Sequence, residues 1–262
     1  MKQLTENEFE KVSPIIYMNE GPTPTFAHSV LEHFIPGCVF VDDSSFPKTI
    51  LLGTNSGIYF ICGVESNDEF NMSLLEFCKT KMGDGEKRFT LFSSNDKWDR
   101  LLAATLKEEI KQISRYSFTF HPEKYFYEEF NPQKEFTLQR IDEDTIRNSV
   151  YNKEYYEDYW GSVSNFLEKA FGFSVLHNET VASECTTIFR GKAFAEIDIE
   201  TNTEYRGMGL ARSVAHAFID HCLKNKIVPC WDCTVSNLPS MKLAEKLGFG
   251  NPRKYSIFVK NS

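Results

Sequence analysis

The segment TNTEYRGMGLA (residues 201–211) joins a strand pattern to a helix pattern through two glycines. Before it, KAFAEIDIET (192–201) alternates apolar and polar residues, as a strand does. After it, apolar residues recur at four-residue spacing from Leu210 to Cys222, which predicts a helix. The first turn of such a helix has backbone N–H groups without internal partners, and glycines let a phosphate approach them. A tight strand-to-helix turn is the simpler alternative.

The composition indicates a globular chain and excludes some partners. Of 262 residues, 41% are hydrophobic and 25% are charged, and the formal net charge is −8, which argues against a phosphate-backbone interface and hence against a nucleic-acid partner. No stretch approaches the roughly 20 apolar residues of a membrane helix, and the N-terminus lacks a basic, then apolar leader. The seven cysteines are scattered, mostly in apolar segments, as reduced thiols usually are. We therefore expect a cytoplasmic protein without a membrane partner.

The predicted elements fall into two halves of similar order. Each half runs strand, strand, strand, helix, strand, helix, strand, which predicts the α/β class with a mixed sheet. The charged segment 121–136 has two prolines and reads as the connection. We expect an N-terminal α/β domain over 1–130 and a second domain over 136–262. A tandem duplication of one fold is a hypothesis from element order alone.

The element boundaries follow from periodicity and turn residues. Predicted helices span 68–81, 95–110, 141–150, 152–172, 209–225 and 237–248. Predicted strands lie within 37–63 and at 87–94, 114–120, 172–179, 180–189, 192–201, 228–236 and 254–259.

Two signatures in the second half resemble those of a known family. Arg206, Gly209 and Ala211 match the R-x-x-G-x-A form of an acetyl-CoA loop, and NLPSMKLAEKLGF (237–249) places an Asn before a helix ending in EKLGF. One helix and one strand fit between them. In these features residues 136–262 resemble the GNAT N-acetyltransferase superfamily, most closely the branch containing the zwittermicin A self-resistance acetyltransferase.

The resemblance implies a GNAT-like acyltransferase fold in the C-terminal half, with acetyl-CoA as co-substrate and no metal. After GIYFICG the first half continues with VESNDEF, which lacks the loop glycines, so that half looks like a degenerate GNAT-like domain. The resemblance further implies that strand 192–201 holds the pantetheine arm and that the loop holds the pyrophosphate. The implied cofactor-binding residues are Ile199, Glu200, Thr201, Arg206, Gly207, Met208, Gly209, Leu210, Ala211 and Asn237. Asn237 reads alternatively as a helix N-cap.

Acetyl transfer to an amine requires a proton acceptor, because a free alkylamine with a pKa around 10 arrives protonated. Glu196, Asp198 and Glu200 alternate along one strand and should share a face. We expect Glu196 to be the base, with Glu200 second and a merely solvated face as the alternative. The resemblance implies that the backbone N–H of Thr201 holds the oxyanion. Many relatives have an acidic Tyr where this chain has Ala244, which leaves the catalytic acid open between Ser240, water and none.

These features favour an acetyl-CoA-dependent N-acetyltransferase that acts on the primary amine of a small molecule. The segment EYYEDYW (154–160) mixes acids and aromatics that could surround a cationic amine, or it is an amphipathic helix with aromatics in the core. The rival function is a non-catalytic module that binds or senses acyl-CoA. The C-x-x-C spacing at 230–233 lies in a predicted strand, which favours buried thiols over a redox site.

Overall fold

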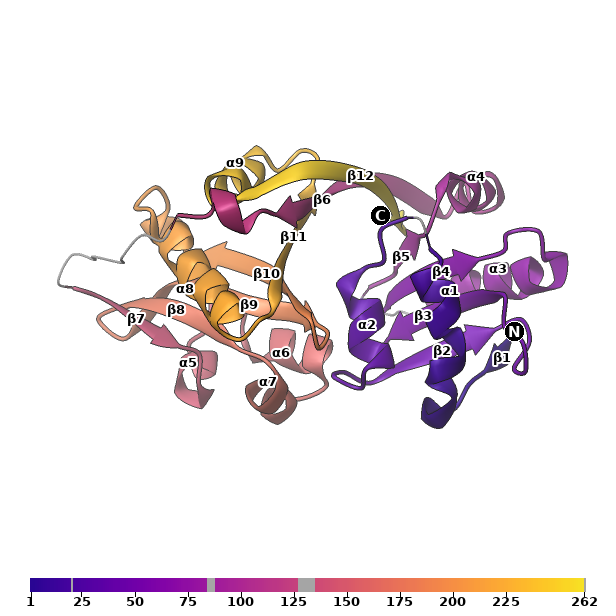
Figure 1. The fold of residues 1–262 in the computed structure, drawn as a ribbon, viewed down its shortest axis with the longest axis horizontal. Helices are drawn as coiled ribbons and strands as arrows, with labels where there is room; N and C mark the ends of the chain where they lie inside the picture. Colours follow the sequence, from indigo (N-terminus) through magenta and orange to yellow (C-terminus); the bar gives the residue numbers. More distant parts are fainter. Residues whose placement is uncertain (20, 84–87, 127–134, 262) are drawn as a thin grey trace. The chain divides into compact units, whose positions relative to one another are not determined.

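The computed structural model describes residues 1–19, 21–83, 88–126 and 135–261, and its α/β fold with mixed sheet pairing confirms the predicted class (Figure 1). The chain divides into two compact units, Met1–Arg115 with Lys254–Ser262, and Tyr116–Arg253. The predicted connection over 121–136 lies partly outside the described residues. No helix in the described part of the chain has both the length and the apolar character that crossing a membrane requires.

The first unit is a sheet in the order β1-β2-β3-β4-β5-β12, in which β4 and β5 pair parallel and the other neighbours pair antiparallel. Its strands are β1 (Lys2–Gln3), β2 (Gly37–Val41), β3 (Thr49–Thr54), β4 (Ile58–Gly63), β5 (Thr90–Ser93) and part of β12 (Phe249–Lys260). Its helices are η1 (Glu6–Val12), α1 (Ser13–Tyr17), α2 (Thr25–Leu31), α3 (Asp68–Gly83) and α4 (Asp96–Thr105). Every residue of β3 is buried, which places this strand at the centre of the core.

The second unit has the strand order β6-β11-β10-β9-β8-β7, with β10 and β11 as its parallel pair. Its strands are part of β6 (Ile110–Phe120), β7 (Phe136–Arg140), β8 (Gly172–His177), β9 (Thr180–Arg190), β10 (Phe194–Thr201) and β11 (Val228–Thr234). Its helices are η2 (Pro122–Lys124), α5 (Glu143–Arg147), α6 (Lys153–Trp160), α7 (Val163–Lys169), η3 (Thr203–Tyr205), α8 (Leu210–Lys224) and α9 (Leu238–Lys246).

Each unit passes through the same succession of a strand, short helices, three strands, a helix, a strand, a helix and a last strand. The last strand of each succession, β6 in the first and β12 in the second, pairs in the sheet of the other unit. Strand β12 fills the sixth position of the first sheet, where Ile257 pairs with Phe92 of β5, and β6 fills the sixth position of the second sheet. Both β6 and β12 therefore contribute residues to both units.

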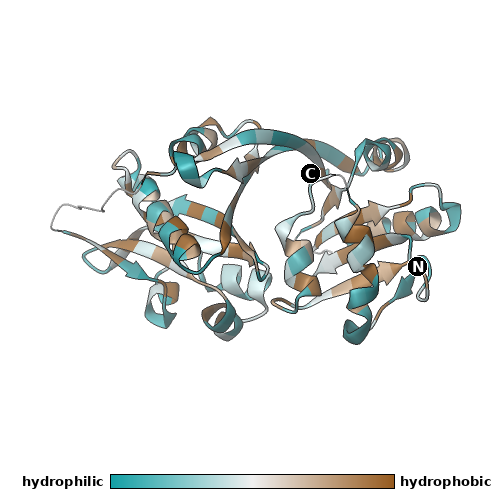
Figure 2. Cartoon of the chain, viewed as in Figure 1, coloured by the Kyte–Doolittle hydropathy of each residue, from teal (hydrophilic) through white to brown (hydrophobic). Residues whose placement is uncertain are grey.

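Helix α8 forms as its apolar stripe predicts. Leu210, Val214, Phe218 and Cys222 are all buried and share one core cluster with residues of β8, β9 and β10. Figure 2 shows hydrophobic and hydrophilic residues interspersed around this helix, as expected for an element with one face on a sheet. The packing fixes the N-terminus of α8 close to the end of β10.

Two predicted helices are shorter than expected. The helix predicted over 152–172 breaks at Gly161, which adopts a left-handed φ of 77° and ends α6, and the Ser162 side chain accepts the N–H of Asn165 to start α7. The helix predicted over 95–110 begins at its Asn95 cap but ends at Thr105, and residue 110 already belongs to β6.

Candidate active site

Strand β10 has an edge that is unpaired over its second half. Strand β9 accompanies β10 as far as Thr201, whereas β11 pairs only with its first three residues, ending at Glu196. The register with β9 shifts directly after Glu196. Asn202 N donates to the Ala182 carbonyl, so the alternation of an antiparallel ladder turns the N–H groups of Ile199 and Thr201 away from β9. Backbone donors therefore face the open edge.

The glycine loop ends at the N-terminus of α8 and exposes backbone donors there. Gly207 and Gly209 have φ values of 82° and 81°, which favour glycine, and an added Cβ at either would meet no atom within 4 Å. Gly209 is the N-cap of α8 and supplies no side-chain cap. In the described part of the chain, the N–H groups of residues 207–211 donate to no protein acceptor. Five donors and the positive end of a helix dipole face open space, which suits an anion.

Arg206 closes the loop against β10. Its Nε donates to the Thr201 carbonyl at 3.1 Å, and its Nη2 lies 3.0 Å from the Glu200 carboxylate. The Thr201 hydroxyl lies 2.8 Å from the Ser183 Oγ. The Glu200 carboxylate is therefore already engaged by a cation.

The three acids of β10 share a face, as predicted. Ala195 and Ile197 belong to the core cluster with α8, so the alternating acids project to the opposite face. There the Tyr155 hydroxyl donates to Asp198 Oδ2 at 2.8 Å. Burial raises the pKa of Asp198 above its ordinary value, and hydrogen bonding to the Tyr155 hydroxyl partly opposes the rise.

The aromatic residues of 154–160 divide between the core and the face that carries the acids. Tyr156 and Trp160 are fully buried, as in an amphipathic helix. Tyr155 instead stacks on Tyr151 with ring centroids 4.3 Å apart, and Tyr159 lies 4.8 Å from it. The Tyr151 hydroxyl is buried. The Tyr155 ring, whose hydroxyl binds Asp198, thus lies between two further tyrosine rings.

Sequence reasoning missed a buried carboxylate on the same face. Glu184 lies opposite Glu200 in the β9–β10 register and is fully buried. It accepts from Ser149 Oγ at 2.8 Å, from Val150 N at 3.2 Å and from the Tyr156 hydroxyl. Burial raises the pKa of Glu184, although its hydrogen bonds act in the opposite direction. An acid inside the apolar strand TVASECTTIF was the only signal in the sequence.

In the second signature, residues 237–249, Asn237 has the helix N-cap geometry that was the alternative interpretation of this residue. The Asn237 side-chain oxygen accepts from Ser240 N at 3.1 Å and caps α9. Ser240 Oγ accepts from Trp231 Nε1 at 3.0 Å. Ala244 is fully buried in the core cluster, so this position serves packing and offers no acid. Residues 230–233 lie in β11, and Cys230 and Cys233 are thiols rather than parts of a disulfide.

Comparisons with known proteins agree with this geometry. Residues 17–258 match the GNAT acetyltransferase family. The chain is 44% identical over 259 residues to the uncharacterized N-acetyltransferase YdfB of Bacillus subtilis (strain 168), covering 98% of each protein.

Two solved structures extend the likeness to the fold of the whole chain. A GCN5-related N-acetyltransferase-like protein from Streptococcus suis 89/1591 is 25% identical with a TM-score of 0.75, covering 97% of this chain and 100% of that one. A tandem GNAT protein from the clavulanic acid biosynthesis pathway has a TM-score of 0.67 at 12% identity, covering 99% and 97%. At 12% identity the likeness concerns the fold alone.

Proposed function

Because this chain belongs to the GNAT acetyltransferase family and is an N-acetyltransferase, we propose that it transfers an acetyl group from acetyl-CoA to a primary amine of a small molecule. The observation that carries the proposal is the open edge of β10 beside the five free N–H groups of residues 207–211. An extended polar chain pairs with the first, and a pyrophosphate suits the second.

The cofactor would lie along β10 and end at the loop. Of Ile199, Glu200 and Thr201, the first and the last would hold the pantetheine arm through their backbone, as a neighbouring strand would be held, because the backbone groups of Glu200 face β9. The amides of residues 207–211 would take the pyrophosphate. Arg206 would exchange the Glu200 carboxylate for a phosphate oxygen, with which a guanidinium makes charge-assisted hydrogen bonds. Asn237 would contact the arm through its amide nitrogen, because its oxygen caps α9.

The acceptor amine would enter the face that carries the acids. Asp198, with the rings of Tyr151 and Tyr155 beside it, would attract the ammonium group. Glu196 would take the proton, so that the neutral nitrogen can attack the thioester carbonyl. The N–H of Thr201 would stabilise the oxyanion, after which the C–S bond breaks and the thiolate of CoA leaves. With Ala244 buried, the thiolate would leave without a tyrosine acid.

We further propose that the first unit is a degenerate copy of the same fold. The shared succession of elements and the matching strand order support this duplication. The segment after β4, VESND at 64–68, lacks glycines and carries two acids, which is unsuited to pyrophosphate. Membership of the branch with the zwittermicin A self-resistance acetyltransferase stays a prediction.

Thermal melting with acetyl-CoA tests the cofactor site. A ligand at a hundred times its Kd stabilises the native state by about 2.7 kcal/mol, which raises the melting temperature visibly. We expect this shift for the wild type with acetyl-CoA but not with adenosine, and its loss in Gly209→Asp, where a carboxylate faces the phosphates. Gly209→Asn is the matched control, because Asn tolerates a left-handed backbone without adding charge.

The same samples separate the proposal from its rival. Release of free thiol with one member of a panel of primary amines supports the transferase. A melting shift without thiol release for any amine would favour the binding module. Absence of a shift in the wild type contradicts the cofactor site itself.

A further inference from the structure

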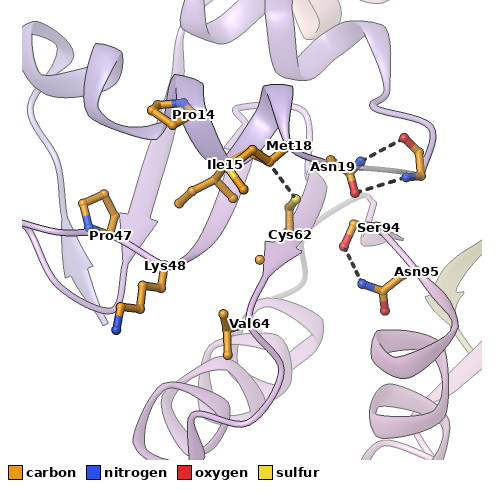
Figure 3. Close-up of a pocket in the computed structure, with 12 residues that line it drawn as sticks. Pro14, Ile15, Met18, Asn19, Pro47, Lys48, Cys62, Val64, Ser94 and Asn95 are labelled. Carbon is orange, nitrogen blue, oxygen red and sulfur yellow. Dashed lines mark hydrogen bonds between the residues drawn. The ribbon is translucent and has the colours of Figure 1, made fainter.

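The first unit contains a pocket of about 490 Å³ that the acetyl-transfer chemistry does not use (Figure 3). The parallel ladder of β4 and β5 ends at the pair Ile61 and Ser93. The next residues of both strands line the pocket, and the carboxyl ends of adjacent parallel strands are where α/β sheets bind ligands. Its lining residues are Pro14, Ile15, Met18, Asn19, Gly21, Pro47, Lys48, Cys62, Gly63, Val64, Ser94 and Asn95.

Much of the wall is apolar. Pro14, Ile15 and Met18 come from α1 and the residue that follows it, and Val64 directly follows β4 (Figure 3). Met18 is 81% exposed and Val64 is 44% exposed, so apolar side chains face solvent at this site. A pocket of this volume with an apolar wall is typical of sites for small organic molecules. The unbranched Met18 side chain can adapt to differently shaped ligands.

The charge of the lining is positive. Its ionisable side chains are Lys48 and Cys62, and no acid lines the pocket among the described residues. Burial raises the pKa of Cys62 to about 11, so this thiol is neutral near pH 7. The Lys48 ammonium forms no ion pair or hydrogen bond with the described residues. A single available cation therefore stands beside the apolar wall.

The amide side chains of the lining are already occupied. Asn19 Nδ2 donates to the Gly21 carbonyl and to Thr23 Oγ1, and Asn95 Oδ1 accepts two N–H groups at the start of α4. They shape the pocket and leave the recognition of a polar group to Lys48. Glu65 and Asp68 follow the strand end, which disfavours a ligand with several phosphates.

We propose that this pocket binds an amphipathic organic monoanion, whose apolar body packs on Ile15, Met18 and Val64 and whose acidic group pairs with Lys48. Neither the apolar wall nor the single cation suits a polyphosphate or a polyamine. The proposal concerns the first unit and holds whether or not acetyl-CoA binds the second.

Two fluorescent dyes of the same ring system test it on the full chain. 1-Anilinonaphthalene-8-sulfonate carries one negative charge, and N-phenyl-1-naphthylamine carries none. We expect Lys48→Met to weaken sulfonate binding by roughly three- to tenfold, as loss of one partly exposed ion pair does, and to leave the neutral dye unaffected. Lys107→Met, at an exposed lysine away from the pocket, should change neither dye.

Two further substitutions place the dyes. Val64→Trp fills the pocket and should remove binding of both dyes, whereas Met72→Trp, at a 66% exposed position on α3, should not. Met18→Glu puts a negative charge at an 81% exposed position and should weaken the sulfonate more than the neutral dye. Sodium dodecanoate should displace the sulfonate dye from the wild type, which extends the result to carboxylates.

Three outcomes would overturn the proposal. Unchanged sulfonate affinity in Lys48→Met removes the anion site, and unchanged binding in Val64→Trp places the dye elsewhere. Displacement of the Val64-dependent signal by CoA identifies a second CoA-binding site instead. Because Gly209→Asp alters only the loop of the second unit, loss of the dye signal there would also place the dye outside this pocket.

Discussion

The three carboxylates of β10 share a face but have different surroundings. Glu200 is paired with Arg206, and Asp198 accepts a hydrogen bond from the Tyr155 hydroxyl. Glu196 is the last residue of β10 that pairs with β11. Alternation alone predicted the shared face. The partner of Asp198 is Tyr155, about 40 residues earlier in the chain, and the partner of Glu200 is Arg206 in the glycine loop. The spacing of the three acids along the strand could therefore not assign their roles.

Kinetics of three substitutions separate those roles. Glu196→Gln should lower kcat by about 10²- to 10⁴-fold with little change in the KM for the amine, as expected for loss of a general base. Asp198→Asn should mainly raise the KM for the amine, because it removes the charge that attracts the ammonium group. Glu200→Gln is the matched control and should have the smallest effect on kcat. If Asp198→Asn instead shows the large loss in kcat, Asp198 is the base and the assignment of Glu196 is wrong.

At the scale of elements, Glu184 joins the sheet to the segment that begins α6. Glu184→Ala would leave the Ser149 hydroxyl, the Val150 N–H and the Tyr156 hydroxyl without their acceptor. Tyr156 is buried, whereas Ser149 and Val150 are half-buried, and one buried unsatisfied donor costs about 1–3 kcal/mol, so we expect a loss of about 1–3 kcal/mol in the free energy of unfolding. Urea unfolding measures it. Glu168→Ala, at an exposed position on α7, should stay within about 0.5 kcal/mol of the wild type, and an equally small loss for Glu184→Ala would contradict the argument.

Most elements of the second unit were predictable, because their periodicity is strong and their caps are local. Strand β10, helix α8, strand β11 and helix α9 all appear close to their predicted bounds. Helix 152–172 was predicted as continuous because its apolar pattern continues across Gly161, whose left-handed backbone a pattern cannot show. The sequence predicted neither the short strand β7 nor any element over residues 1–36.

In the candidate site, too, features formed by neighbouring residues were predictable and contacts between distant residues were not. The glycine loop could be found because its residues are contiguous, whereas the hydrogen bonds of Glu184 join residues about 35 positions apart and leave no local pattern. The role of Asn237 as a cap was one of two predicted alternatives, and the contact of Arg206 with Glu200 was not predicted. Long-range partners are what sequence spacing leaves out.

At the scale of the whole molecule, β12 is part of the hydrophobic core of the first unit, although it lies far from the rest of that unit in the sequence. Phe258 of β12 is 1% exposed and packs in the cluster that contains Leu51 and Trp98 of the first unit. Phe258→Ala should lower the free energy of unfolding by about 3–5 kcal/mol, as other buried Phe-to-Ala substitutions do. Phe46→Ala, at an 80% exposed position, serves as the control. Equal unfolding midpoints for the two variants would show that β12 does not stabilise the first unit.

The exchange of last strands also sets the timing of folding during synthesis. Domains usually fold in the order in which the ribosome releases them, at about 5–20 residues per second. Here the first unit lacks its sixth strand until β12 is translated, roughly 7 to 28 seconds after β6 has been made. The second unit, by contrast, receives β6 in advance. Throughout that interval the edge of β5 stays unpaired, as a strand edge that other nascent chains could join. The half that is made first is the half that is completed last.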